Sequence, residues 1–169
     1  DPEVTFVPNK NMSSYFNRDN AFQNMKYIRS IPLYDTSSMV YIGQMFDGCT
    51  NLETIPLLDT SNVTSMSWMF NDCRNLETIP PLNTSKVTGM STMFSGCTNL
   101  KTIPLLDTSN VTSMSNMFQN CTSLETIPPL NTGNVKYMSG MFSGCSKLKT
   151  IPLLDTSKVT SMETTFQNC

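Results

Sequence analysis

Histidine is absent from this 169-residue chain, and charged residues make up only 14% of it. Without histidine, the chain lacks the commonest general base and the commonest transition-metal ligand. Its 11 basic and 13 acidic residues give a net charge of −2, which disfavours nucleic-acid binding because that requires clustered Lys and Arg. No apolar run approaches the roughly 20 residues that span a bilayer, so direct membrane insertion is not expected.

What the chain has instead is a repeat of 24 residues. The repeating pattern is L-x-T-I-P-x-L-[DN]-T-S-x-V-T-x-M-S-x-M-F-x-x-C-x-x. It accounts for the unusual content of 6 Cys, 13 Met and 10 Pro. The cysteines recur at one position of the unit: Cys49, Cys73, Cys97, Cys121, Cys145 and Cys169. Met25 takes that position in the first unit, and a proline recurs in every unit from Pro8 to Pro152.

The repeat divides the chain into two parts. Residues 1–27 are predicted to be a degenerate N-terminal capping repeat, because Tyr15, Arg18 and Ala21 replace the usual Val, Met and Met. Residues 28–169 form six repeats of one solenoid domain, the last of them clipped. One unit is too small to bury its own apolar side chains, so neighbouring units must stack. The fold class predicted is therefore a repeat solenoid.

Within one unit, Leu52–Pro56 reads as a short parallel strand that the proline ends, because proline has no N–H to extend a ladder. Asp59–Ser61 is typical of a corner, where short oxygen-bearing side chains bond nearby backbone N–H groups. Val63–Met66 is interpreted as a second short strand, with a longer helix as the alternative. Ser67–Cys73 suits one helical turn with Ser67 as its N-cap.

A longer period is superimposed on the repeat. Leu57-Leu58-Asp59 alternates with Pro81-Leu82-Asn83, and the same two versions recur at residues 105–107 and 129–131. We interpret this alternation as the result of duplicating a two-repeat block.

The run M-F-x-x-C-x-x-L-x-x-I-P at residues 69–80, together with D-T-S-x-V-T-x-M-S-x-M-F at residues 59–70 and 107–118, resembles the BspA-like leucine-rich repeats of bacterial surface proteins. The second motif is similar to the subgroup known as the bacterial surface protein 26-residue repeat. The resemblance implies a right-handed leucine-rich solenoid with short parallel strands on its concave face. It also implies a surface or secreted location and a role in adhesion or protein binding. The chain differs from the family in its 24-residue unit, in Thr-Ile-Pro within the strand, and in showing no anchor.

The sulfur-bearing columns are expected to fill the core. The main hypothesis for the cysteines is a stack of reduced, buried thiols. Disulfides between neighbours and a metal site are the alternatives, although stacked side chains point in parallel rather than toward one another. The Asp and Asn of the corner are interpreted as capping residues, with calcium binding as the alternative. No cofactor is predicted.

Candidate partner-binding residues come from two kinds of position. Positions that flank the inward Leu and Ile of the strand should face outward; they are Glu53, Thr54, Glu77, Thr78, Lys101, Thr102, Glu125 and Thr126. Aromatic residues at positions that vary freely between units should be exposed; they are Tyr41, Trp68 and Tyr137. Exposed aromatic residues commonly anchor binding surfaces. A solvated strand face and scattered surface variation are the alternatives.

The function predicted is non-enzymatic, because a uniform solenoid gives columns of like residues rather than the convergent unlike residues of a catalytic site. We expect adhesion through binding a protein or glycan on a host or neighbouring cell. The alternatives are a structural spacer or assembly module, including a virion-borne attachment protein, and a carbohydrate-binding module. The open C-terminal end is a candidate surface for self-association.

Overall fold

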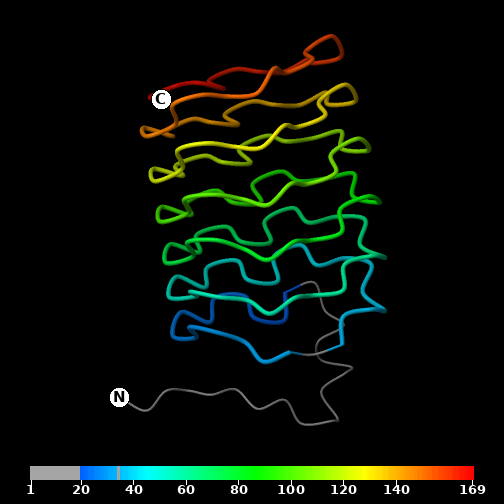
Figure 1. Cartoon of the computed structure of the whole chain (residues 1–169), viewed down its shortest axis with the longest axis vertical. Coiled ribbons are helices and arrows are strands. Elements are labelled where there is room, and N and C mark those ends of the chain that lie inside the picture. Colours follow the sequence, from blue (N-terminus) through cyan, green and yellow to red (C-terminus); the bar gives the residue numbers. More distant parts are fainter. Residues whose placement is uncertain (1–19, 34) are drawn as a thin grey trace.

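The computed structural model describes residues 20–33 and 35–169. Figure 1 shows this part of the chain as a single stack of similar coils, which rises steadily from the N-terminal to the C-terminal end. The predicted solenoid is confirmed. Tyr15 and Arg18, which suggested the capping repeat 1–27, lie outside the described residues.

The interior is built from columns of identical side chains, one from each coil. One column is a stack of near-parallel rings, with centroids 5.4–5.7 Å apart and interplanar angles of 4–15°: Phe22, Phe46, Phe70, Phe94, Phe118, Phe142 and Phe166. The predicted burial of the Met and Cys columns is confirmed for the coils between residues 39 and 145. Stacking thus gives each unit the burial that it cannot achieve alone.

Each coil has two long sides. We call residues 63–73 and their equivalents the turn side, and residues 52–58 and their equivalents the proline side. Within the described residues there is no helix, and the strand content consists of isolated parallel bridges on the turn side. These bridges join one residue per coil along the column Tyr41, Ser65, Gly89, Ser113, Tyr137 and Ser161.

The turn side uses its backbone N–H groups alternately in two directions. Trp68, Phe70 and Asp72 donate to carbonyls of the next coil at 2.7–3.0 Å. The residues between them donate back within the coil, as Asn71 does to Trp68 at 3.1 Å. The same two sets of bonds recur through the stack. Every backbone N–H from Trp68 to Cys73 is satisfied in this way.

The turn side is a chain of tight turns, and the predicted helical turn with Ser67 as its N-cap is wrong. Trp68 and Asp72 both have left-handed backbones, with φ of 65° and 56°. Two left-handed residues in seven are incompatible with a right-handed helical turn. They suit β-turns with positive φ at the third position, closed by the bonds from Met69 to Met66 and from Cys73 to Phe70.

The left-handed position of Asp72 explains a feature of the two-repeat period. Asx and Gly alternate strictly along this column: Asn24, Gly48, Asp72, Gly96, Asn120, Gly144 and Asn168. A Cβ on Gly96 would lie 2.5 Å from Oδ1 of Asp72, and one on Gly48 or Gly144 would meet the Asn of the preceding coil in the same way. An Asx side chain in one coil therefore requires glycine in the next coil, so the alternation has a steric basis in addition to any origin by duplication.

The strand predicted at Leu52–Pro56 does not form, although Leu52 and Ile55 point inward as expected. On the proline side, direct backbone bonds join coils only in pairs, from Glu53 and Thr54 to Arg29, from Lys101 to Glu77, and from Lys149 to Glu125. Since every coil also has a proline here that cannot donate, no continuous ladder develops.

The predicted corner is confirmed. Asp59 and its equivalents accept the backbone N–H of the residue two places on, as in Ser61 to Asp59 at 3.0 Å. The neighbouring threonine is buried and reaches the next coil: the hydroxyl of Thr60 donates to the carbonyl of Asn83 at 2.9 Å. Equivalent bonds are made by Thr36, Thr108 and Thr132.

Candidate partner-binding surfaces

The strand-flanking candidates lie on the proline side and are all exposed: Glu53, Thr54, Glu77, Thr78, Lys101, Thr102, Glu125 and Thr126. Their charges pair across coils. The ammonium group of Lys101 lies 2.7 Å from the Glu77 carboxylate, and that of Lys149 lies 2.5 Å from the Glu125 carboxylate. The Lys149 ammonium lowers the pKa of Glu125 through this bond and its charge. Much of this surface is therefore neutralised internally.

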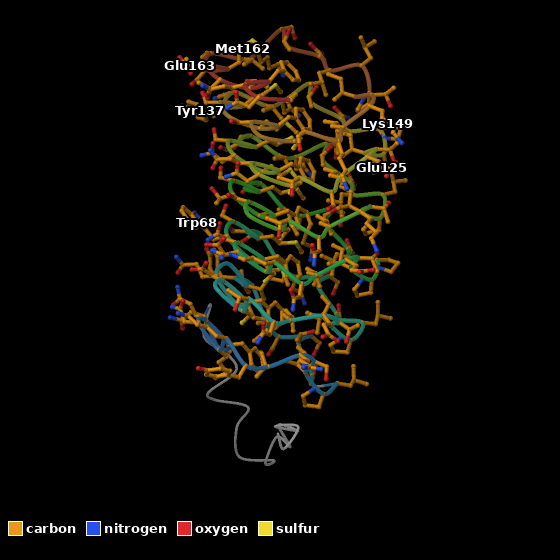
Figure 2. All side chains as sticks on the ribbon, turned by 90° about the vertical axis from the view of Figure 1, so that its left-hand side faces the viewer. Trp68, Glu125, Tyr137, Lys149, Met162 and Glu163 are labelled. Carbon is orange, nitrogen blue, oxygen red and sulfur yellow. The ribbon has the colours of Figure 1, made fainter. Side chains whose placement is uncertain are left out.

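The aromatic candidates lie on the turn side, where Tyr41, Trp68 and Tyr137 are 57%, 43% and 50% exposed. Figure 2 shows Trp68 and Tyr137 along one edge of the stack, with Glu125 and Lys149 along the opposite edge. The structure thus confirms the exposure of both groups, but it does not bring them together. They form two separate surfaces.

The aromatic residues project from a surface of small polar side chains. Tyr41 and Tyr137 share their bridging column with Ser65, Gly89 and Ser113. Neighbouring hydroxyls on this side bond one another, as Ser91 and Ser113 do at 2.6 Å. Because the neighbouring side chains are small, the aromatic rings project beyond them and are accessible to a binding partner.

A third surface was missed by the sequence analysis. The residue after the recurrent proline is apolar and exposed in every coil described: Leu33, Leu57, Pro81, Leu105, Pro129 and Leu153. Leu105 is 70% and Leu153 97% exposed. We call this column the apolar ridge. In the sequence, the alternation of Leu and Pro along this column indicated exposure. The adjacent Leu58 and Leu82, which point inward, made the whole segment look like part of the core.

The ridge borders a groove of about 670 Å³ at the corner of three coils. Leu105 and Pro129 contribute apolar walls, and Asn83, Asp107 and Asn131 contribute polar ones. Thr84 also lines the groove.

The five buried thiols, from Cys49 to Cys145, are unsuited to nucleophilic chemistry. The six cysteines are free, and those from Cys49 to Cys145 are buried, whereas Cys169 is exposed. Each buried thiol donates to a carbonyl of the preceding coil, as Cys73 does to Phe46 at 3.1 Å. Burial raises the pKa of Cys49 and of Cys145 to about 12, and raises those of the thiols between them as well. The five buried thiols are therefore neutral at physiological pH.

The carboxylates bind hydroxyl and amide groups of the chain itself. Hydrogen bonds from Ser109 lower the pKa of Asp107, and the hydroxyls of Ser139 and Ser161 lower that of Glu163 to about 2. Across residues 20–33 and 35–169, no three His, Cys, Asp or Glu side chains are grouped so that they could hold a metal ion. A search of the same residues finds no helix with the length and hydropathy to span a membrane.

Comparison with known proteins places the chain in a family. The sequence profile of a family described as "Mycoplasma protein of unknown function, DUF285" matches residues 10–102 and 74–169. The chain belongs to this family. No curated protein sequence matches it.

Solved structures of bacterial leucine-rich repeat proteins share the fold of this DUF285 chain. One from Eubacterium ventriosum is 23% identical with a TM-score of 0.64. The aligned region includes 88% of this chain and 38% of the Eubacterium protein. A leucine-rich cell surface protein of Faecalibacterium prausnitzii is 28% identical with a TM-score of 0.55, and covers 84% and 42% respectively. One from Bacteroides ovatus is 19% identical with a TM-score of 0.52, and covers 83% and 44%. The chain thus spans less than half the length of these relatives.

At the last coil, side chains that are interior elsewhere become exposed. Phe166 and Met162 are each 45% exposed, whereas Phe142 and Met138 one coil earlier are fully buried. This is the end proposed for self-association, which stays a prediction.

Proposed function

We propose that this chain is a non-enzymatic module of the BspA-like leucine-rich repeat type, secreted or displayed at a cell surface, which mediates adhesion by binding a protein on a host or neighbouring cell. The cell-surface name of the Faecalibacterium relative supports the location. The presence of columns of like residues, with buried neutral thiols, supports a binding role over a catalytic one.

The observation that carries the proposal is the exposed ring of Trp68 at a position whose backbone disfavours a bulky side chain. Its φ of 65° lies in the left-handed region. The equivalent residues of the other coils share this backbone, with φ of 56–64°, and Asn and Gly tolerate it best: Gln44, Thr92, Asn116, Gly140 and Thr164. Tryptophan here therefore opposes local folding preference.

Burial does not compensate for the strain, because Trp68 is 43% exposed. Since the left-handed backbone is common to this position, what distinguishes Trp68 is a large exposed ring where the other coils place smaller or polar side chains. Tryptophan is also the residue type most enriched among residues that dominate binding energy. Tyr41 lies one coil away along the turn side and extends the same surface. We therefore assign the partner contact to Trp68 and Tyr41, with Tyr137 three coils further along the same side.

Binding to intact cells tests the proposal. Fluorescently labelled chain should bind cultured epithelial cells saturably, and trypsin treatment of the cells should abolish the signal. Trp68→Asn copies the residue of another coil and should weaken binding by at least about tenfold without loss of fold. Tyr27→Ser is the matched control, since Tyr27 is an exposed aromatic residue outside this surface.

Two results would contradict the proposal. Equal binding by Trp68→Asn and the unaltered chain would remove Trp68 from the contact, and absence of saturable binding would favour the structural-spacer alternative. Binding that survives trypsin, together with signals on a glycan array, would favour the carbohydrate-binding alternative instead.

A further inference from the structure

The groove beside the apolar ridge is distinct from the Trp68 surface. Its walls come from three successive coils, at Leu82, Leu105 and Pro129. Leu105 is 70% exposed although the exposed apolar area brings no folding advantage. The alternation of Leu and Pro makes the ridge uneven, with Leu105 standing between Pro81 and Pro129. Such a surface can accept side chains of a partner between its projections.

The coils are less tightly joined at the groove than elsewhere along the corner. Thr60 and Thr108 each donate to the carbonyl of an Asn in the next coil, at 2.9 Å in both cases. The equivalent Thr84 is only 2% exposed, yet its hydroxyl has no hydrogen-bond partner. Thr84 lines the groove. The interruption of this bond ladder therefore coincides with the hollow.

The polar wall of the groove is negative. The Asp107 carboxylate accepts both bonds from Ser109 through Oδ1, at 3.0 and 2.7 Å. It forms no ion pair with any residue that the structure describes. Asp59 and Asp155 repeat this arrangement two coils away on either side. The apolar ridge is thus accompanied by a carboxylate in every second coil from Asp59 to Asp155, although the charge of Lys158 acts on the last of them.

This charge pattern selects the occupant. A second copy of the chain packed ridge to ridge would bring two rows of unpaired carboxylates together, which is unfavourable. A segment that combines apolar side chains with Lys or Arg would contact the ridge and neutralise Asp107 at the same time. An extended segment suits a surface that repeats at every coil, because alternate side chains of such a segment face one way.

We propose that the groove between Leu105, Asp107 and Pro129 binds an extended segment of a partner protein in which apolar residues are interleaved with Lys or Arg. This surface is additional to the Trp68 surface, and binding to it does not depend on Trp68.

Synthetic peptides test the groove directly. The probe is a fluorescein-labelled peptide of about ten residues that repeats Leu-Lys-Pro, and the matched peptides repeat Leu-Glu-Pro or Ser-Lys-Pro. Fluorescence anisotropy should show the Leu-Lys-Pro peptide binding at least about tenfold more tightly than either matched peptide. Equal binding of the Leu-Lys-Pro and Leu-Glu-Pro peptides would overturn the charge argument.

Variants locate the binding. Leu105→Ser and Asp107→Asn should each weaken binding of the Leu-Lys-Pro peptide by about tenfold or more. Tyr27→Ser is the control, because Tyr27 is exposed but is not part of the ridge. Trp68→Asn should bind the peptide as the unaltered chain does. If Leu105→Ser bound as well as Tyr27→Ser, or if Trp68→Asn lost binding, the assignment to this groove would be overturned.

Discussion

Every coil contributes one segment to the turn side and one to the proline side, but neighbouring coils are joined differently on the two sides. On the turn side, each coil donates a series of backbone bonds to the next, and the ring, thioether and thiol columns behind it are fully buried between Met45 and Cys145. On the proline side of the described coils, direct backbone bonds join coils only in pairs, and apolar residues face outward. The turn side therefore maintains the stack, which leaves the proline side free to vary its surface.

Alkaline pH should produce the largest effect, because it acts on the interior behind the turn side in five coils at once. Burial raises the thiol pKa values from 9.0 to about 12 for Cys49 and Cys145, and upward for the three thiols between them. A group with a raised folded-state pKa stabilises the fold fully below its unfolded pKa and loses that contribution as the pH rises through the folded value. Stability should therefore decrease steeply between about pH 9 and pH 12.

Urea denaturation followed by circular dichroism across this pH range measures the effect. Cys97→Ala with Cys121→Ala should reduce the steepness of the decrease, although it lowers stability at neutral pH. An unchanged slope would show that the thiols do not govern alkaline unfolding.

Phe94→Ala tests the turn-side core by a single truncation. Phe94 lies between two stacked rings, 5.6 Å from Phe70 and 5.7 Å from Phe118, and is fully buried. The variant should lower the free energy of unfolding by about 3–5 kcal/mol. Leu105→Ala on the proline side should change it by less than about 0.5 kcal/mol, because its side chain is exposed. Comparable losses in the two variants would contradict the distinction between the sides.

Gly96→Ala tests the steric basis of the Gly and Asx alternation. Gly96 has a φ of 73°, and an added Cβ would meet Oδ1 of Asp72. We expect a loss of about 1–2 kcal/mol from the left-handed backbone and this contact. Adding Asp72→Gly should recover the part due to the contact.

Gly133→Ala is the control for Gly96→Ala. A Cβ at Gly133 meets its nearest atoms at 3.4 and 3.5 Å, and its backbone lies outside the left-handed region. This variant should be within about 0.5 kcal/mol of the unaltered chain. Equal losses at the two glycines would remove the steric explanation.

Thr108→Val and Thr84→Val compare two positions of the corner between the sides. The Thr108 hydroxyl donates to the carbonyl of Asn131 and accepts its N–H, at 2.9 and 2.8 Å. Removing that hydroxyl should cost about 1–2 kcal/mol, because it leaves the part-buried carbonyl and N–H of Asn131 without this partner. Thr84→Val should be neutral or slightly stabilising, since the hydroxyl it removes has no partner. Thermal denaturation of both variants decides the matter, and an equal loss would mean that Thr84 is bonded in solution.

The interior and the exposed aromatic residues could be predicted from the sequence because each depends on one position repeated in every unit. Identical inward residues imply a core column, as for Phe70, and variation at one position implies exposure, as for Trp68. The Asx corner at Asp59 was predictable for a similar reason, since its bond to Ser61 is local.

The turn geometry and the groove could not be predicted in this way because they depend on pairs of coils. The apolar spacing of Met66, Met69 and Phe70 fits a helical turn as well as successive tight turns, and the left-handed Trp68 and Asp72 separate the two. The groove takes its lining from three successive coils, at Leu82, Leu105 and Pro129. Periodicity within one unit contains no information on such contacts.

Lys101→Ala should have the smallest effect and tests what the paired charges contribute to the proline side. The Lys101 and Glu77 side chains are 61% and 59% exposed, so solvent screens their attraction. The backbone bond from Lys101 to Glu77, at 3.1 Å, would remain in the variant. We expect a loss of less than about 0.5 kcal/mol, no greater than for the control Lys136→Ala, whose ammonium pairs with no carboxylate of the described chain. A loss above about 1 kcal/mol would mean that cross-coil ion pairs, as well as the turn side, hold the stack together.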